Sequence, residues 1–584
     1  MRSFLRSFLA SLLAIIIFVI LAFFFFAGIL GGIASRKVVR IADQSVLVID
    51  PSSHFAEQET RNPLAIIRAG EKDVPGLYDV VRLIKRASTD KKIEGIYLIA
   101  NGNANSYAAS NEIRTALAEF KKTGKFIIAH GDILTQQAYS IANIASRIYV
   151  SPQGYMDWSG YNVDYVFLKG ALDKLEIQPQ IFYAGKFKSA TEPLRAEQMT
   201  PENKLQTSVW LNDLYNDLLI KTAEARNVDT ATLHRLANES AIRTAADAVT
   251  FKLIDAVKYD DEVKDEIKTK LKIDKYKKIN FVTLDEYFDA RPMVPAGKEK
   301  IALIYAEGDI IDGKSGKGSI GGETYRNLIR KARLDRTVKA IVFRINSGGG
   351  SSLASENIWR ELSLAKKEKP VIVSFGDVAA SGGYYISVAA DSIFALPTTI
   401  TGSIGVFGII PNMGSFFKNK LGVTFDGVKT ADHADAGTIV RPLTESEKQL
   451  MQANVDLIYS LFKKRVAEGR KLDMTLVDSI AQGRVWTGLR AKEIGLIDRF
   501  GGIEDAVRSA AAMAKLTDYT VHEYPESRSL IEQLFGPDAD PLSYSDKLRT
   551  EMGADNYKIY LELKRLHEMT GSVQARLPFQ FLVR

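Results

Sequence analysis

Short apolar runs alternate with stretches of helical spacing over much of the chain. The runs AIVFRI (residues 340–345) and PVIVSF (370–375) have the length and the β-branched content of buried strands. Between them, the segment SLASENIWRELSLAKKEK carries its apolar residues at helical spacing. This alternation predicts an α/β fold with a mostly parallel sheet covered by helices. In such sheets, sites form where strands end and helices begin.

The most apolar part of the chain lies near its start. Between Arg6 and Arg36 there are 29 residues without a formal charge, and about 20 apolar residues suffice to cross the hydrocarbon core of a bilayer. The apolar region of a cleavable signal peptide is shorter, about 7–15 residues. The run therefore favours an uncleaved transmembrane helix within residues 1–36, with everything after it on one side of the membrane. Positive charges flank the run almost equally, so they do not fix its orientation.

The chain also repeats itself. The stretch IEGIYLIANGNANSYAASNEI, from Ile93, aligns with VKAIVFRINSGGGSSLASENI, from Val338, at an offset of 245 that continues without a gap to Gly160 and Gly405. Further on, residues 244–255 resemble residues 487–498 at an offset of 243. Each copy begins with a β-rich run, and the Pro- and Gly-bearing segment 290–300 reads as a linker. We therefore predict a tandem duplication, with a first repeat at 37–295, a second at 296–525 and a C-terminal extension at 526–584.

Composition excludes several classes of function. A chain of 584 residues exceeds what one hydrophobic core usually supports, in agreement with two domains. The absence of cysteine excludes a thiolate nucleophile and any Cys-ligated metal, and the six histidines form no HExxH-like pair. The net charge of +7 is spread along the chain, without a basic block interleaved with aromatics. We expect no metal, no cofactor and no nucleic-acid partner.

Two Gly- and Ser-rich turns carry the candidate chemistry. NSGGGSS (346–352) follows the first of the two strands and opens a helix, and GDVAASGG follows the second, which puts Ser381 at a helix start. Such neighbouring turns can hold a hydroxyl beside backbone N–H donors, as acyl transfer needs. Taken singly, each turn is explained as well by the small residues that any strand-to-helix connection favours.

Comparison of the two copies favours the chemical interpretation. The counterpart of Ser381 in the first copy is Gln136, and the counterparts of Gly349 and Gly350 are Ala104 and Asn105. The first copy has kept the scaffold without the candidate nucleophile and glycines.

A serine nucleophile also needs a base to remove its proton. His433 and His130 are candidates, but neither has an obvious partner carboxylate. A lysine serves as well if burial keeps it neutral, and GKFKSATEP in the first copy offers Lys186 and Lys188. One copy would then hold the serine and the other the lysine.

Together, NSGGGSSLASE, GDVAASGGYYIS, TGSIGVFG and GKFKSATEP resemble the signal peptide peptidase A (protease IV) family in its long tandem form. The resemblance covers nearly the whole chain. It implies a crotonase-like fold related to the Clp protease subunit. It also implies a serine endopeptidase with Ser381 as nucleophile, Lys188 as general base, and Gly349 and Gly382 as the oxyanion hole. Ser403 would hold the lysine amine in place.

The resemblance further implies a cellular location, an oligomeric state and a class of substrates. Its members keep their catalytic domains on the periplasmic side of the inner membrane, tethered by the N-terminal helix, and assemble as homotetramers that degrade signal-peptide remnants and other hydrophobic peptides. One departure is that Gly348 stands where the family usually has proline. Two other classes stay open: a crotonase-like acyl-thioester enzyme and a catalytically inactive membrane scaffold. The apolar C-terminal stretch 577–584 could pack on a neighbour or lie near the bilayer, or be a plain extension.

Overall fold

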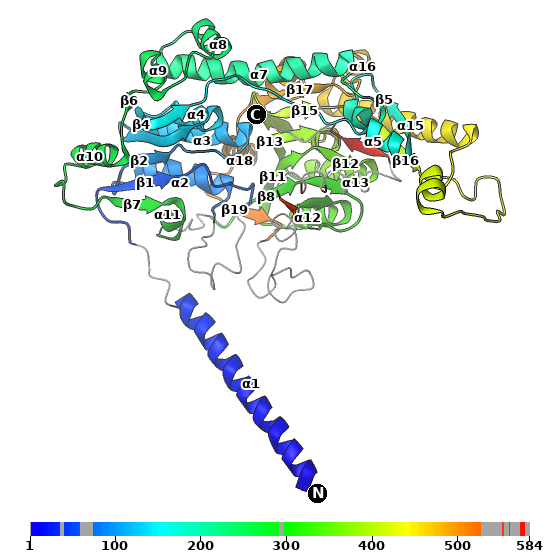
Figure 1. Cartoon of the computed structure of the whole chain (residues 1–584), viewed down its shortest axis with the longest axis horizontal. Coiled ribbons are helices and arrows are strands. Elements are labelled where there is room, and N and C mark those ends of the chain that lie inside the picture. The colour runs from blue at the N-terminus through cyan, green and yellow to red at the C-terminus, as the bar shows by residue number, and fades with distance from the viewer. Residues whose placement is uncertain are drawn as a thin grey trace.

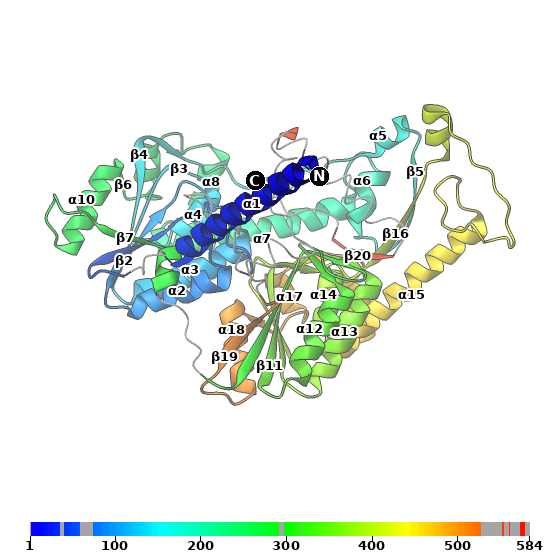
Figure 2. The same cartoon turned by 90° about the horizontal axis from the view of Figure 1, so that it is seen from below.

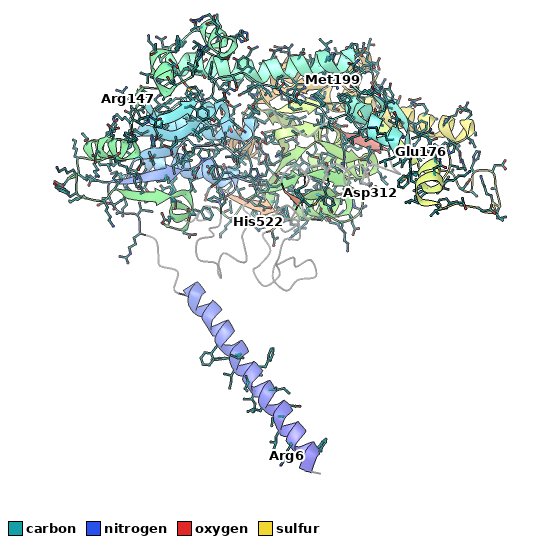
Figure 3. The ribbon with its side chains drawn as sticks, in the orientation of Figure 1. Arg6, Arg147, Glu176, Met199, Asp312 and His522 are labelled. Atoms are coloured by element: carbon teal, nitrogen blue, oxygen red, sulfur yellow. The ribbon has the colours of Figure 1, made fainter. Side chains whose placement is uncertain are left out.

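The computed structural model describes residues 2–34, 40–58, 74–290, 297–316, 318–526, 552–553, 557, 560 and 573–577. Helix α1 (Arg2–Ala34) stands apart from the folded body, with Arg6 close to its far end (Figures 1 and 3). Within the described residues, no helix combines the length and the apolar character that a membrane span requires. The transmembrane helix stays a prediction from the sequence.

The first repeat forms a parallel six-stranded sheet in the order β6-β4-β3-β2-β1-β7. Its strands are β1 (Ser45–Ile49), β2 (Ile93–Ile99), β3 (Phe126–Leu134), β4 (Arg147–Met156), β6 (Ala256–Val257) and β7 (Asn280–Thr283). The helices that accompany them are α2 (Leu77–Thr89), α3 (Tyr107–Lys122), α4 (Gln136–Ala142), α8 (Thr230–Asn238), α9 (Ala245–Thr250), α10 (Asp260–Leu271) and α11 (Leu284–Ala290). One apolar core lies between the sheet and α2, α3 and α4, and a smaller one lies under α10.

The second repeat builds an eight-stranded sheet in the order β17-β15-β13-β11-β8-β19, with β14 beside β13 and β18 beside β14. These strands are β8 (Lys300–Glu307), β11 (Val338–Ser347), β13 (Val371–Ala380), β14 (Ser392–Ala395), β15 (Ile400–Gly402), β17 (Val485–Thr487), β18 (Arg499–Phe500) and β19 (Thr520–Tyr524). Its helices are α12 (Gly322–Leu334), α13 (Ser352–Lys366), α14 (Gly382–Ser387), α15 (Glu445–Arg470), α16 (Met474–Ile480), α17 (Gly488–Glu493) and α18 (Ile503–Met513). All its pairs are parallel except β15 with β17.

A third sheet joins the two repeats. Its order is β10-β9-β12-β20-β16-β5. From the first repeat comes β5 (Gln178–Ala184); the other strands are β9 (Asp309–Ile311), β10 (Ser319–Gly321), β12 (Gly349–Ser351), β16 (Val406–Asn412) and β20 (Gln574–Arg576). Strand β5 pairs antiparallel with β16 over its whole length, from Gln178 opposite Asn412 to Ala184 opposite Val406. The residues that follow β5 are thereby carried into the second repeat.

Helix α7 (Pro201–Arg226) also links the repeats, since it runs along one side of both (Figure 1). Its Trp210 and Leu214 pack against Ala380 and Val485 of the second repeat. The view from below separates the first-repeat sheet from the second-repeat sheet (Figure 2). The arm formed by β5 and α7 therefore fixes how the first repeat meets the second.

The predicted strand, helix, strand unit of the second repeat is confirmed as β11, α13 and β13. Strand β13 is longer than the apolar run, because after Phe375 its backbone pairs with β15, from Val378 opposite Ile400 to Ala380 opposite Gly402. Most of the predicted linker, residues 291–296, lies outside the described residues. So does most of the predicted C-terminal extension, including residues 578–584.

Candidate active site

Ser381 lies where β13 ends and α14 begins. Its side chain is fully buried, its backbone N–H donates to Gly402 O at 2.8 Å, and its φ and ψ are 54° and −116°. A positive φ is costly for a residue with a Cβ and is found where the surroundings enforce it. The chain thus holds this serine in a strained conformation at the junction between two packed elements.

The two glycines after Ser381 allow close packing. A Cβ atom on Gly382 would lie 2.8 Å from Ser355 Oγ, and one on Gly383 would lie 2.5 Å from Ser347 O. Larger residues at either position would push α14 away from the end of β11 and from α13. The Gly-Gly pair is required by the fold itself, whatever chemistry the turn performs.

Lys188 reaches the serine from the other repeat. It follows β5, and the Phe187 N–H beside it donates to Gln482 O at 2.9 Å, which ties the segment to the second repeat. Lys188 Nζ lies 2.9 Å from Ser381 Oγ. Gly483 packs against this lysine so closely that a Cβ there would lie 2.7 Å from Lys188 Cβ. Both repeats are therefore needed to bring the two side chains together.

Burial determines the pKa of the Lys188 amine. The lysine is 1% exposed, and its Nζ lies 6.0 Å from the centre of the Phe407 ring. Desolvation holds the pKa of the Lys188 amine well below its usual 10.5. An amine in this position is neutral over a pH range in which an exposed lysine is charged.

Ser403 completes the surroundings of the amine. Lys188 Nζ lies 3.0 Å from Ser403 Oγ and 3.3 Å from Ser403 O. Ser403 follows β15, has a φ of 50°, and its N–H donates to Arg484 O at 2.7 Å. Backbone bonds thus fix the serine that contacts the lysine twice.

The predicted oxyanion glycines lie beside the serine and border one carbonyl oxygen, that of Ala575 in β20. A Cβ on Gly349 or on Gly382 would lie 2.0 Å or 3.0 Å from this oxygen. Gly349 has a φ of 99°, which favours glycine. Its N–H donates to Ser347 Oγ at 3.1 Å.

The other candidate bases lie elsewhere. Lys186 is exposed and stands 5.5 Å from the centre of the Phe187 ring. His433 is exposed, and His130 contacts Tyr97 and Ser151 within the first repeat. Of the candidates named from the sequence, Lys188 alone contacts Ser381. No group of three or more His, Cys, Asp or Glu residues among the described ones could hold a metal ion.

In the first repeat, the positions equivalent to Ser381 and Gly350 carry amide side chains that form hydrogen bonds with the backbone. Gln136 accepts from the Gly160 N–H at 2.9 Å and donates to Gly160 O at 2.9 Å. Asn105, opposite Gly350 in the alignment, is buried and accepts from the Phe55 N–H at 2.8 Å. These amides close the space that the second repeat leaves for a hydroxyl and a loop of glycines.

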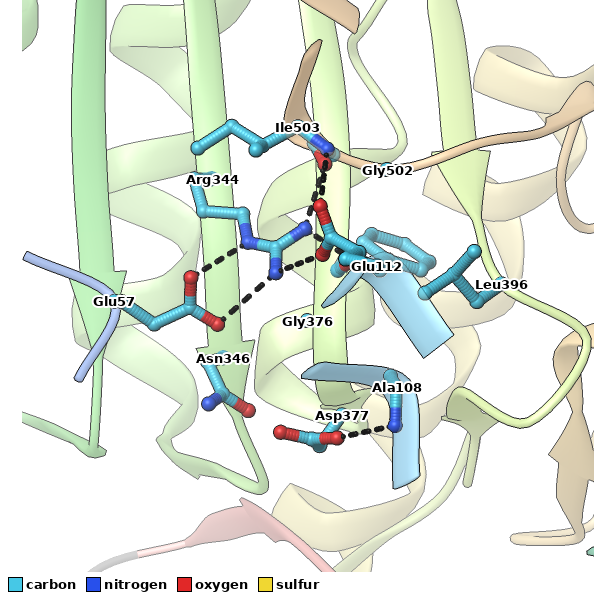
Figure 4. A network of polar contacts seen from close by, with 12 residues as sticks. Glu57, Ala108, Glu112, Arg344, Asn346, Gly376, Asp377, Leu396, Gly502 and Ile503 are labelled. Carbon is cyan, nitrogen blue, oxygen red and sulfur yellow. Dashed lines mark hydrogen bonds and ion pairs between the residues drawn. The ribbon is translucent and has the colours of Figure 1, made fainter. Parts of the chain in front are cut away.

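A buried ionic cluster, which the sequence analysis missed, locks the repeats together (Figure 4). Arg344 of β11 contacts Glu57 at 2.8 Å and Glu112 at 2.6 Å, both from the first repeat. Glu112 also accepts from the Ile503 N–H at 2.9 Å, and Asp377 accepts from the Ala108 N–H at 2.8 Å. The signal for this cluster was a single arginine inside the apolar run AIVFRI, because a buried charge needs partners.

Burial in this cluster changes the pKa of Glu57. Desolvation raises the pKa of the Glu57 carboxyl to about 7, although the Arg344 guanidinium acts in the opposite direction. The contact between the repeats therefore includes a carboxyl that titrates near neutral pH.

Comparison with known proteins gives the family. The model of peptidase family S49 matches residues 119–274 and 363–517. "Protease 4" from Salmonella typhi is 37% identical over 470 residues, which cover 78% of this chain and 75% of that protein. "Putative signal peptide peptidase SppA" from Enterococcus faecium is 38% identical over 235 residues, 39% of this chain and 68% of that protein.

Among solved structures, a mutant of ClpP1 from Listeria monocytogenes is 15% identical, with a TM-score of 0.24, over 35% of this chain and 94% of its own. A score this low does not establish a shared fold, so the crotonase-like fold stays a prediction. The two S49 matches fall on the two repeats found in the sequence, and the second includes Ser381. The chain therefore belongs to peptidase family S49, a serine peptidase family, and carries two regions of that family in tandem.

Proposed function

We propose that the chain is an endopeptidase with a Ser/Lys dyad, in which Ser381 is the nucleophile and Lys188 the general base. The observation that carries the proposal is the 2.9 Å distance between Lys188 Nζ and Ser381 Oγ, in a site where burial lowers the pKa of the amine. A serine hydroxyl reacts with a peptide carbonyl only when a base takes its proton. A neutral lysine amine has the lone pair to do so.

The neighbours of Nζ orient that lone pair. Ser403 O is a carbonyl oxygen and can only accept, so it takes one N–H of the neutral amine. Ser403 Oγ accepts the second N–H. The lone pair is then directed at the Ser381 hydroxyl, which donates to it. Ser403 is a positioning residue in this scheme, because it acts through the lysine.

The reaction follows from this arrangement. As Ser381 Oγ attacks the peptide carbonyl, its proton passes to Lys188 Nζ, and the ammonium then gives that proton to the departing amine. Water releases the acyl group from Ser381 by the same route in reverse. Backbone N–H groups at Gly382 and Gly349 would stabilise the oxyanion, the Gly349 N–H by turning from Ser347 Oγ towards the substrate.

The proposed substrates are released signal peptides and other short hydrophobic peptides. Support comes from the aromatic ring of Phe407 beside Lys188 and from the name of the Enterococcus faecium relative. We also propose a single-pass anchor in the inner membrane, formed by the uncharged run from Ser7 to Ser35, with the catalytic repeats on the periplasmic side in a homotetramer. Alkaline extraction of membranes, protease access in spheroplasts and the mass of the purified assembly test these three statements.

An acylating probe tests the dyad directly. A fluorophosphonate should label the wild-type chain on Ser381, and Ser381→Ala should abolish labelling. Lys188→Ala should reduce the labelling rate by at least about a hundredfold, within the range for loss of a general base. Ser387→Ala and Lys186→Ala are matched controls: Ser387 is a buried serine in the same helix, and Lys186 is the exposed lysine two residues away.

Each outcome separates the alternatives. An inactive scaffold would show no label on Ser381 in any variant. An acyl-thioester enzyme would turn over acyl-thioesters while leaving peptides intact. Loss of activity in Lys186→Ala, with Lys188→Ala still active, would contradict the assignment of the base.

A further inference from the structure

Gln206, in the second turn of α7, carries a buried amide that the proposed reaction leaves without a role. The side chain is 1% exposed and lies where the segment around Lys188 meets β17 of the second repeat. A buried amide needs partners for its oxygen and for its N–H groups. Those partners lie on both sides of the contact between the repeats.

The amide nitrogen binds both ends of the turn that carries Lys188. This lysine is the central residue of an inverse γ-turn, with φ −74° and ψ 76° and with the Ser189 N–H donating to Phe187 O at 2.8 Å. Gln206 Nε2 lies 3.2 Å from Phe187 O and 2.8 Å from Ser189 Oγ. One side chain thus contacts the residue before the lysine and the residue after it.

The amide oxygen binds the second repeat. Gln206 Oε1 accepts from the Val485 N–H at 3.2 Å. Val485 pairs with Gly402 in the contact of β17 with β15, and the Gly402 carbonyl accepts from the Ser381 N–H at 2.8 Å. The residue after Gly402 is Ser403, which contacts the lysine amine. The same amide is therefore joined to the backbone of the nucleophile through one pair of strands.

These partners fix which way the amide points. A backbone N–H can only donate and a carbonyl can only accept, so Val485 requires the amide oxygen and Phe187 requires the nitrogen. Turning the amide over would place oxygen against oxygen and N–H against N–H. Asn203 Oδ1 is a third acceptor for the nitrogen, at 3.1 Å, and Asn203 Nδ2 donates to Glu192 at 2.9 Å. The network thus favours one orientation of Gln206.

We propose that Gln206 is a positioning residue for the general base, because it holds the turn at Lys188 against β17 and so keeps the amine buried beside Ser381. The inference rests on the proposed function. The Phe187 end of the turn has a second anchor, since its N–H donates to Gln482 O at 2.9 Å. Loss of the amide would leave that end anchored and would let the other end move.

Gln206→Met should change both the rate of reaction and its pH dependence. Methionine has nearly the length of glutamine but no amide, so the turn loses its clamp, and a misplacement of about 1 Å can cost about a hundredfold in rate. We expect the rate of fluorophosphonate labelling at pH 7 to fall about ten- to a hundredfold. A looser turn also admits water to Nζ and raises the pKa of the Lys188 amine towards 10.5, since burial is what lowers it. The rise of the labelling rate with pH should therefore shift to higher pH.

Gln136→Met is the matched control. Gln136 is also a buried glutamine whose amide both donates to and accepts from the backbone, but its partner is Gly160 of the first repeat. Urea unfolding should show a loss of stability in both variants. The control should keep the wild-type labelling rate and pH profile. A Gln206→Met chain that loses stability but keeps the wild-type rate and pH profile would overturn the inference, because its amide would then serve the fold alone.

Ser189→Ala tests the same contact if Gln206→Met does not fold. It removes one hydroxyl that Gln206 binds, so the labelling rate should fall about two- to tenfold, as for one hydrogen bond, and the pH profile should shift in the same direction. An unchanged rate and profile would overturn the inference. Lys188→Ala separates this inference from the proposed function: full labelling of that variant would overturn the dyad itself, whereas slow labelling of it beside wild-type behaviour of Gln206→Met would overturn only the role of Gln206.

Discussion

The strained backbone of Ser381 predicts an unusual response to glycine. A residue with a Cβ at φ 54° and ψ −116° stores about 1–3 kcal/mol of strain, and glycine adopts these angles without it. At an unstrained position, glycine lowers the free energy of unfolding by about 0.5–1 kcal/mol relative to alanine, through the entropy of the unfolded chain. Loss of the buried methyl group lowers it by about 0.8 kcal/mol more. The stability of Ser381→Gly should therefore lie between about 0.8 kcal/mol below and about 1.7 kcal/mol above that of Ser381→Ala.

Ser387 provides the comparison. It is also a fully buried serine, it lies at the end of α14, and it is not among the residues with positive φ. There, glycine should be less stable than alanine by about 1–2 kcal/mol, from helix propensity and the lost methyl group. The glycine and alanine variants differ in their free energy of unfolding at each position. This difference should change by about 1–3 kcal/mol from Ser387 to Ser381, which is the strain at Ser381.

The assay is equilibrium unfolding in urea, followed by tryptophan fluorescence. The Ser387 variants should also carry Ser381→Ala, so that no variant digests its own unfolded chain. If the glycine and alanine variants differ in free energy of unfolding by the same amount at both positions, the conclusion that the fold holds Ser381 under strain is refuted.

Four other predictions concern the contacts of the dyad and the repeats. Lys188→Met should abolish peptide hydrolysis yet raise the free energy of unfolding at pH 7 by about 1 kcal/mol, since it removes a buried amine whose charged form burial disfavours; a destabilised variant would contradict this. In the wild type, kcat/KM should rise with pH as the Lys188 amine loses its proton, with an apparent pKa well below 10.5; a plateau already reached at acid pH would argue against a lysine base. Ser403→Ala should lower kcat about tenfold, the effect of one lost hydrogen bond to Nζ, with KM little changed in steady-state assays. Arg344→Met should destabilise the chain by about 3–5 kcal/mol, because it leaves Glu57 and Glu112 buried without their partner, as urea unfolding would measure.

Glu57 predicts a second pH effect, on stability. Its pKa is raised from 4.5 to about 7 in the folded state, so the folded chain binds more protons than the unfolded chain between these values. The contribution of Glu57 to stability should be largest below pH 4.5 and should decrease as the pH rises towards 7. Glu57→Gln should flatten this part of the dependence of the unfolding free energy on pH. An unchanged slope would mean that Glu57 does not titrate in this range.

The sequence predicted the parts of the site that depend on local pattern. Alternating apolar runs and helical stretches predicted the parallel β11–α13–β13 unit, and the Gly- and Ser-rich turns predicted that Ser381 would stand at a helix start. These features are local because a strand or helix is encoded by neighbouring residues. The internal repeat predicted two copies, and the exchange of Ser381 for Gln136 pointed to the copy with the hydroxyl.

The residue pattern left Lys186 and Lys188 open, the resemblance named Lys188, and the tertiary structure gives the physical reason. Lys186 and Lys188 are two residues apart, and the pairing of β5 with β16 turns the second towards Ser381 and leaves the first exposed. The depressed pKa of Lys188 likewise needs the burial that both repeats create together. The ion pairs of Arg344 with Glu57 and Glu112 join residues hundreds of positions apart. The pairing of β20 with Gly350 does the same. No local pattern encodes such contacts, because each depends on how surfaces that are remote in sequence pack in the folded chain.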